Sequence, residues 1–73
     1  MELLELVSIF NDVLNKEGKE VISGETQFKE CEHWDSMSAF EIAEKIHTKF
    51  GLRLKGIQIR KCSTIEELFN SLG

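Results

Sequence analysis

Apolar residues recur at intervals of three and four in the first segment of the chain, the spacing of a buried helix face. The pattern predicts a first helix from Glu2 to about Glu17. It should end near Gly18, because glycine readily adopts the left-handed conformation that often closes helices. The residues expected on the buried face are Leu3, Leu6, Val7, Phe10, Val13 and Leu14.

Residues 18–34 show no sustained period and are predicted to form a long connection. A connection of this length in so small a domain is usually functional or pinned to the core by side chains of its own. The apolar residues expected to anchor it are Val21, Ile22, Phe28 and Trp34.

A second helix is predicted from Asp35 or Ser36 to Phe50, with Gly51 as its terminator. Successive residues are about 100° apart around a helix, so one stripe of this segment is apolar and should face the core. That stripe consists of Ala39, Ile42, Ala43, Ile46 and Phe50.

The opposite face of this helix is polar except for one apolar residue. Met37 lines up there with Glu41, Glu44 and Thr48, at spacings of four, three and four. Single exposed apolar residues are common on protein surfaces, so chance exposure is one interpretation. The other is that Met37 contacts a partner.

The last third of the chain predicts one irregular segment and one clear helix. Apolar residues alternate from Leu52 to Ile59, but the chain offers no partner strand, so a loop and a short helical turn are expected. Ser63 or Thr64 should cap the last helix, and Glu66 or Glu67 should complete its capping box. Its apolar stripe is Ile65, Leu68, Phe69 and Leu72. The fold class is therefore all-α, a small four-helix bundle of three main helices and one short one.

Size and composition fit one small folded domain covering residues 1–73, which we expect to be a monomer. Apolar residues make up 41% of the chain and charged residues 30%, the balance of a globular protein rather than a disordered one. No apolar run is long enough to span a bilayer, and no signal segment is evident. We therefore expect a cytoplasmic protein without a membrane partner.

The net charge of −4 argues against nucleic-acid binding, which depends on a basic surface. The charge is unevenly distributed: residues 1–34 hold eight acids and three bases, for −5, whereas residues 35–73 hold five acids and six bases, for +1. Two differently solvated faces would explain this asymmetry, and so would selection of a partner.

The two cysteines and two histidines do not form a recognisable metal or catalytic motif. Cys31 and Cys62 are expected to be reduced thiols. Their spacing with His33 and His47 matches none of the usual zinc-ligand pairs, and no third group orients a cysteine–histidine pair for catalysis. Neither a metal site nor an enzyme is favoured.

Ser36 is the residue with the clearest chemical role. The first N–H groups of a helix lack intrahelical partners and carry partial positive charge, so an anion attached at this end is stabilised. The alternative is that Asp35 or Ser36 simply caps the helix, as these residue types commonly do.

Taken together, these segments resemble the acyl carrier protein family of phosphopantetheine-binding carrier domains over nearly the whole chain. The resemblance rests on Phe28, on the sequence Trp34-Asp35-Ser36-Met37 at a helix start, and on three later segments in order. These are Phe50-Gly51-Leu52, Ile57-x-Ile59, and the sequence Ser63-Thr64-Ile65-Glu66-Glu67-Leu68 that opens the last helix.

The resemblance implies that Ser36 is the attachment residue for 4′-phosphopantetheine. A phosphopantetheinyl transferase would transfer this group from coenzyme A to the Ser36 hydroxyl, forming a phosphodiester. Asp35 matches the family's acidic residue beside the serine, which in similar carriers helps bind a metal ion during transfer. That magnesium ion would belong to the modifying complex, so no resident metal is expected.

The resemblance further implies a carrier that is not itself an enzyme. An acyl, aminoacyl or peptidyl group would be held as a thioester on the arm and delivered to loading and downstream biosynthetic enzymes. Met37, Glu41 and Glu44 are the residues expected to dock on them. The alternative from another class is an unmodified helical interaction module of the same fold.

The chain departs from fatty-acid carriers in the second half of the second helix. Those carriers continue it with acids, which pair with basic patches on their enzymes. Here the corresponding stretch is Lys45-Ile46-His47-Thr48-Lys49, followed by Arg53 and Lys55. We therefore expect a specialised pathway, such as polyketide, nonribosomal peptide, aminoacyl or polysaccharide-modifying chemistry, rather than ordinary fatty-acid synthesis.

Overall fold

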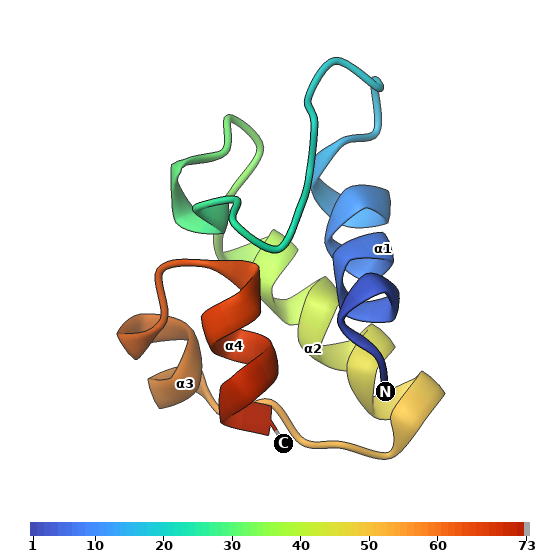
Figure 1. Ribbon diagram of the computed structural model, residues 1–73, viewed down its shortest axis with the longest axis vertical. Coiled ribbons are helices and arrows are strands. Elements are labelled where there is room, and N and C mark those ends of the chain that lie inside the picture. Colours follow the sequence, from blue (N-terminus) through green and yellow to red (C-terminus); the bar gives the residue numbers. More distant parts are fainter. Residues whose placement is uncertain (73) are drawn as a thin grey trace.

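Helices occupy the segments in which the sequence shows a helical period (Figure 1). The computed structural model describes residues 1–72, and in this part of the chain no strand forms, only an isolated bridge between Gln27 and Thr64. The all-α bundle of three longer helices and one short one is confirmed. Its helices are α1 (Leu3–Leu14), α2 (Ser36–Phe50), α3 (Gly56–Lys61) and α4 (Ile65–Leu72).

The first helix is shorter than predicted, because it ends at Leu14 rather than near Glu17. Asn15 is the reason. Its amide side chain bonds to both the N–H and the carbonyl of Glu20, which turns the chain away from the helix axis. Gly18 does adopt a left-handed conformation, with φ of 70°, but it lies in the turn after the helix.

The predicted bounds of α2 are confirmed. Asp35 has extended backbone angles and caps the helix with its side chain, and Gly51 ends it in the left-handed conformation with φ of 69°. A residue with a Cβ atom is strained at such an angle, so glycine is the favoured residue there.

The core forms where α1 packs against α2 and α4, while α3 packs against α4. On α2, Ile42 and Ile46 are fully buried as predicted, whereas Ala39, Ala43 and Phe50 are only half-buried. Ile9 of α1 joins the buried face although the predicted stripe did not include it. The buried apolar side chains are Leu6, Ile9, Phe10, Val13, Leu14, Phe28, Ile42, Ile46, Cys62, Ile65 and Leu68.

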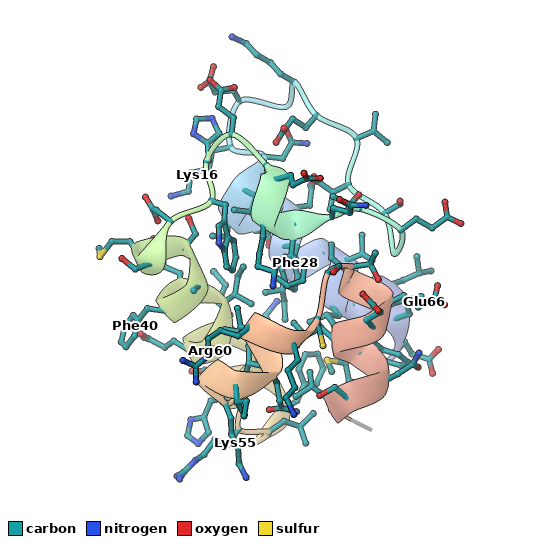
Figure 2. All side chains as sticks on the ribbon, turned by 90° about the vertical axis from the view of Figure 1, so that its left-hand side faces the viewer. Lys16, Phe28, Phe40, Lys55, Arg60 and Glu66 are labelled. Carbon is teal, nitrogen blue, oxygen red and sulfur yellow. The ribbon has the colours of Figure 1, made fainter. Side chains whose placement is uncertain are left out.

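Phe28 anchors the long connection between α1 and α2. It begins a 3₁₀ turn, Phe28–Glu30, and is completely buried. Its ring lies 5.1 Å from the ring of Phe10 and 5.1 Å from that of Trp34, both in tilted or edge-on arrangements that aromatic pairs favour. Figure 2 shows Phe28 in the interior of the molecule.

The other predicted anchors behave differently from one another. Ile22 and Trp34 pack against the core with part of their surface exposed. Val21 is 91% exposed, so its predicted anchoring role is wrong. The Asn15 side chain holds the backbone of the neighbouring residue Glu20, and Val21 then points away from the core.

Backbone hydrogen bonds also tie the connection to the start of α4. The N–H groups of Ile65 and Glu66 donate to the carbonyls of Thr26 and Gly24, at 3.3 and 2.8 Å. Gly24 lies so close to Leu3 that an added Cβ would sit 3.2 Å from its side chain. The connection therefore fits between α1 and α4 instead of looping freely into solvent.

The segment from Leu52 to Ile59 is a loop followed by the short helix α3, as predicted. Gln58 fastens α3 to α4, because its amide donates to the hydroxyl and carbonyl oxygens of Ser71 at 2.6 and 3.2 Å. Thr64 and Glu67 form the predicted capping box of α4: the Glu67 carboxylate accepts from the Thr64 N–H, and the Thr64 hydroxyl accepts from the Glu67 N–H.

We predict that Phe28→Ala destabilises the domain by about 3–5 kcal/mol, the usual loss when a large aromatic is removed from a core. Urea unfolding followed by circular dichroism measures this loss. The matched control is Val21→Ala on the same connection, which should change stability by less than about 0.5 kcal/mol. Equal effects of the two substitutions would contradict the anchoring role of Phe28.

Candidate functional site

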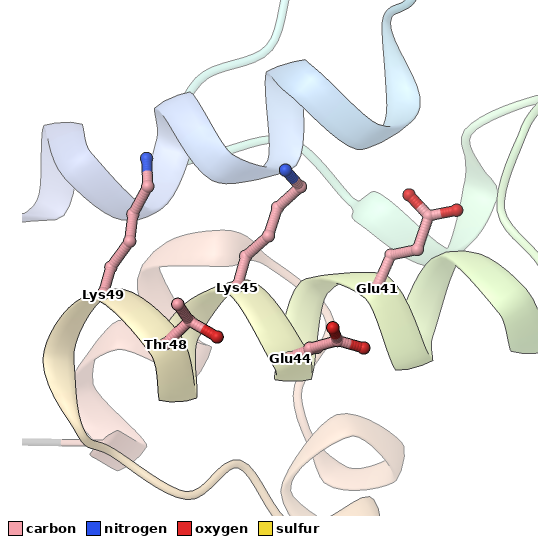
Figure 3. A pocket seen from close by; sticks show the side chains of 5 residues that line it. All are labelled: Glu41, Glu44, Lys45, Thr48 and Lys49. Atoms are coloured by element: carbon pink, nitrogen blue, oxygen red, sulfur yellow. The ribbon is translucent and has the colours of Figure 1, made fainter.

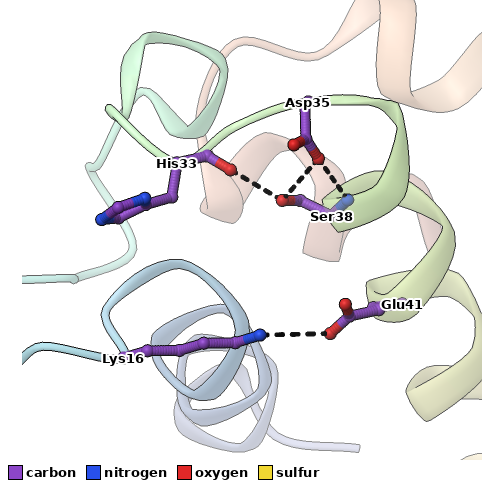
Figure 4. A network of polar contacts seen from close by, with 5 residues as sticks. All are labelled: Lys16, His33, Asp35, Ser38 and Glu41. Atoms are coloured by element: carbon purple, nitrogen blue, oxygen red, sulfur yellow. Dashed lines mark hydrogen bonds and ion pairs between the residues drawn. The ribbon is translucent and has the colours of Figure 1, made fainter.

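The start of α2 is held by a small polar network (Figure 4). The Asp35 carboxylate accepts hydrogen bonds from the Ser38 N–H at 2.7 Å and from the Ser38 hydroxyl at 3.0 Å. The same hydroxyl lies 2.7 Å from the carbonyl oxygen of His33. This network fixes the direction in which the chain enters the helix.

The two serines of this helix turn have opposite environments. Ser38 is buried, with 7% of its surface exposed, and its hydroxyl is engaged in the network. Ser36 is the first residue of α2 and is exposed. Among residues 1–72, no hydrogen bond involves the Ser36 hydroxyl, so it is accessible to a modifying enzyme.

The pKa of Asp35 is lowered from its usual value. The main cause is the hydrogen bond from the Ser38 N–H, followed by the one from the Ser38 hydroxyl, with smaller contributions from the Met37 N–H and His33. All of these stabilise the charged form of the carboxyl group. Both Ser38 bonds end on Oδ1 of the carboxylate.

The aromatic core positions this site. Trp34 directly precedes the Asp35 cap, and its ring packs on that of Phe28. The backbone N–H of Trp34 donates to the backbone carbonyl of Cys31 at 3.1 Å. The chain therefore reaches α2 from a fixed point on the core.

The three residues predicted to dock on enzymes lie along the outer side of α2. Met37 is 68% exposed and Glu44 is exposed. Glu41 is half-buried, and its carboxylate lies 4.0 Å from the ammonium of Lys16. The row of Met37, Glu41, Glu44 and Thr48 is thus polar beyond Met37, as the helical spacing predicted.

A shallow groove of about 430 Å³ follows this outer side, lined by Glu41, Glu44, Lys45, Thr48 and Lys49 (Figure 3). Glu41, Lys45 and Lys49 stand in one row, at intervals of four residues, and Glu44 and Thr48 form a second row beside it. The acids at the head of the helix are therefore followed by bases within two turns.

Phe40 is a second exposed apolar residue near Ser36 that the sequence analysis did not single out. It is 66% exposed and projects outward from α2 (Figure 2). Its spacing of three residues from Met37 could have revealed it, because residues three apart are neighbours on a helix surface.

The cysteines and histidines do not converge. Burial and the charge of Glu20 raise the pKa of the Cys31 thiol, and the side chain of His33 instead faces Glu17 at 3.4 Å. His47 is exposed on α2 and Cys62 is buried in the core. Nowhere in residues 1–72 do three or more His, Cys, Asp or Glu side chains gather as a metal site would require.

The chain belongs to the phosphopantetheine-binding family. The family model described as "Phosphopantetheine attachment site" matches residues 5–72. Domains of this family are non-catalytic carriers that bind 4′-phosphopantetheine covalently, so the protein is a phosphopantetheine carrier. The exposed, unbonded Ser36 hydroxyl at a helix start fits covalent attachment of such a group. Comparison with curated proteins and with solved structures gave no match.

None of the helices in residues 1–72 is both long enough and apolar enough to cross a bilayer.

We predict that the Asp35 cap makes stability depend on pH in the acid range. In the unfolded chain this carboxyl should titrate near 3.8, and in the folded chain its pKa is lower. Its stabilising contribution is therefore complete above the unfolded pKa and disappears as the pH falls through the folded one. Thermal unfolding should show a higher Tm for the wild type than for Asp35→Asn at pH 7, with the difference shrinking below about pH 4.

The control for this titration is Glu25→Gln. Within the described residues the Glu25 carboxylate accepts no hydrogen bond, so this substitution should give a small difference in Tm that does not change with pH. A constant difference for Asp35→Asn as well would contradict the charged cap.

Proposed function

We propose that Ser36 carries the 4′-phosphopantetheine arm of this carrier. The observation that supports the proposal most directly is the exposed, unbonded hydroxyl of Ser36 on the first turn of α2, inside a family match that covers residues 5–72. The phosphodiester would lie beside the positive end of the helix, where negative charge is stabilised.

The modifying reaction is a phosphoryl transfer. The Ser36 oxygen attacks the phosphorus of coenzyme A that bears the pantetheine, and forms the new P–O bond. The bond to the other phosphate breaks, adenosine 3′,5′-bisphosphate leaves, and the hydroxyl proton passes to a base on the transferase. Asp35 would assist, because its exposed carboxyl stays ionised and would be able to hold the metal ion of the transferase complex.

We further propose that Met37, Glu41 and Glu44 dock on the transferase and on the enzymes that load and unload the arm. Their support is their position on the outer side of α2: Met37 is exposed and offers an apolar contact, and the carboxylates of the exposed Glu44 and the half-buried Glu41 offer charge. Such a surface provides recognition, and the arm then brings its cargo to the enzyme at high effective concentration.

The pathway served is proposed to be a specialised one rather than bulk fatty-acid synthesis. The support is the charge of the second half of α2, where Lys45 and Lys49 follow the acids of the first half (Figure 3). An enzyme built to receive a uniformly acidic carrier helix would meet repulsion there. Polyketide, nonribosomal peptide, aminoacyl and polysaccharide-modifying chemistry all remain compatible with this surface.

We predict that co-expression with a broad-specificity phosphopantetheinyl transferase adds one arm, roughly 340 Da, to the wild type, and that Ser36→Ala abolishes the addition. Intact-mass spectrometry measures it. The matched control is Ser38→Ala, two residues away. It removes a hydroxyl from the capping network at a cost of about 1 kcal/mol but should still be modified.

Modification of Ser36→Ala would refute the assignment of Ser36. A wild-type protein that gains no mass under the same conditions would favour the unmodified interaction module.

We also predict that Met37→Ala raises the KM of the transferase for the apo protein about fivefold, since exposed apolar residues at an interface centre commonly contribute about 1 kcal/mol. Initial rates at several protein concentrations give this value. Leu4→Ala is the control, because Leu4 is also an exposed apolar residue, at 79%, but lies on α1. An unchanged KM for Met37→Ala would remove Met37 from the docking surface.

A further inference from the structure

A second groove, of about 290 Å³, lies between α2 and the connection that follows it. We call it the cargo groove. Its lining residues are Phe40, Ala43, Glu44, His47, Arg53 and Leu54.

The cargo groove lies on the row of α2 that begins with Ser36. Phe40, Ala43 and His47 follow Ser36 by four, seven and eleven residues, the spacings that place side chains on one face of a helix. At 1.5 Å per residue, His47 is about 16 Å along the axis from Ser36. A pantetheine arm lying along this row would carry its thioester over the groove.

The cargo groove is lined by both apolar and charged side chains. Phe40, Ala43 and Leu54 make its walls largely apolar, and Phe40 is 66% exposed. His47 and Arg53 add two nitrogen-rich side chains, while Glu44 is the one carboxylate that lines it.

The far end of the groove lies in the most basic part of the chain. Between Glu44 and Glu66 the sequence contains no acidic residue. Six bases lie in that interval, and of these Arg53 lines the groove. They are Lys45, Lys49, Arg53, Lys55, Arg60 and Lys61.

The centre of the bundle offers a cargo little room. Ile42 and Ile46 on the inner face of α2 and Leu68 on α4 are each at most 1% exposed, and they pack into one core. An acyl group placed there would have to displace close-packed side chains. The surface groove requires no such rearrangement.

Building on the carrier function proposed above, we propose that the cargo groove holds the acyl group carried on Ser36, and that this group has an apolar stem and a terminal carboxylate. An extended arm along this row reaches about as far as His47, so the arm covers Phe40 and Ala43, and the apolar stem of the acyl group lies against Leu54. The carboxylate meets Arg53, whose guanidinium can form two parallel hydrogen bonds to it. The natural cargo is thus a dicarboxylic acyl group.

The test compares two acyl groups of equal length. A broad-specificity transferase loads ¹⁵N-labelled protein from coenzyme A, hexanoyl-coenzyme A or adipoyl-coenzyme A, and intact mass verifies each product. Hexanoyl and adipoyl groups both have six carbons, but only the adipoyl group ends in a carboxylate. Amide NMR shifts then report where each cargo lies, and hydroxylamine cleavage reports how well its thioester is shielded.

We expect both acyl groups to shift the amide signals of His47 and Leu54 relative to the unacylated arm. Only the adipoyl group should also shift the signals of Arg53, and this additional shift should vanish in 1 M salt, which screens an exposed charge pair. The adipoyl thioester should be cleaved about twofold to fivefold more slowly than the hexanoyl one, the size expected for one such pair.

Arg53→Gln should remove the difference between the two cargoes in both measurements. The matched control is Arg60→Gln, which changes the other arginine of the chain, a residue on α3 that does not line the groove. It should leave the difference intact.

If the two acyl groups shift the same signals and their thioesters are cleaved at the same rate, the proposal that the natural cargo ends in a carboxylate is overturned. Shifts confined to residues outside the cargo groove overturn the site itself. If intact mass shows that the protein accepts no arm from any of the three coenzyme A donors, the carrier function on which the inference rests is refuted before the cargo is tested.

Discussion

The packing of Phe28 between Phe10 and Trp34 is the interaction on which the rest of the molecule depends. Without it, residues 15–35 would be a long connection with few apolar side chains to hold it. With it, Trp34 is fixed on the core and Asp35 follows directly as the cap of α2. The place where α2 begins, and hence the direction of the Ser36 side chain, follows from an aromatic contact below the surface.

The polar network at the head of α2 separates two serines that are chemically alike. Asp35 and the carbonyl of His33 engage the Ser38 hydroxyl inside the surface, while the Ser36 hydroxyl stays outside it. A buried hydroxyl needs such partners, because an unsatisfied one is costly. The cap therefore stabilises the helix and keeps the Ser38 hydroxyl buried, whereas Ser36 is exposed.

Charge is organised along α2 and the segment after it. Acids stand near Ser36, and bases dominate from Lys45 to Lys61. Exposed charges contribute little to folding, so this gradient has little bearing on why the bundle forms. The gradient instead affects which partner proteins bind this surface, because complementary charge selects partners and guides association.

Sequence alone determined the helices, since their faces, caps and terminators are local patterns. Gly51 ends α2 where it was predicted to, and Asp35, Thr64 and Glu67 each act at one of two positions that the sequence left open. A hydroxyl beside an acidic cap at a helix start is visible in the chain, but only the resemblance to carrier domains pointed to Ser36 as the residue to modify. The family match agrees with the carrier class that this pattern implied.

Only the tertiary structure decided matters that depend on distant parts of the chain. Asn15 ends α1 early by bonding to Glu20, and Val21 points into solvent although its side chain is apolar. The groove between Phe40 and Leu54 exists because the connection after α2 folds back along the helix. Local patterns encode which face of a helix is apolar, but which neighbour covers that face is set by packing between segments far apart in the sequence.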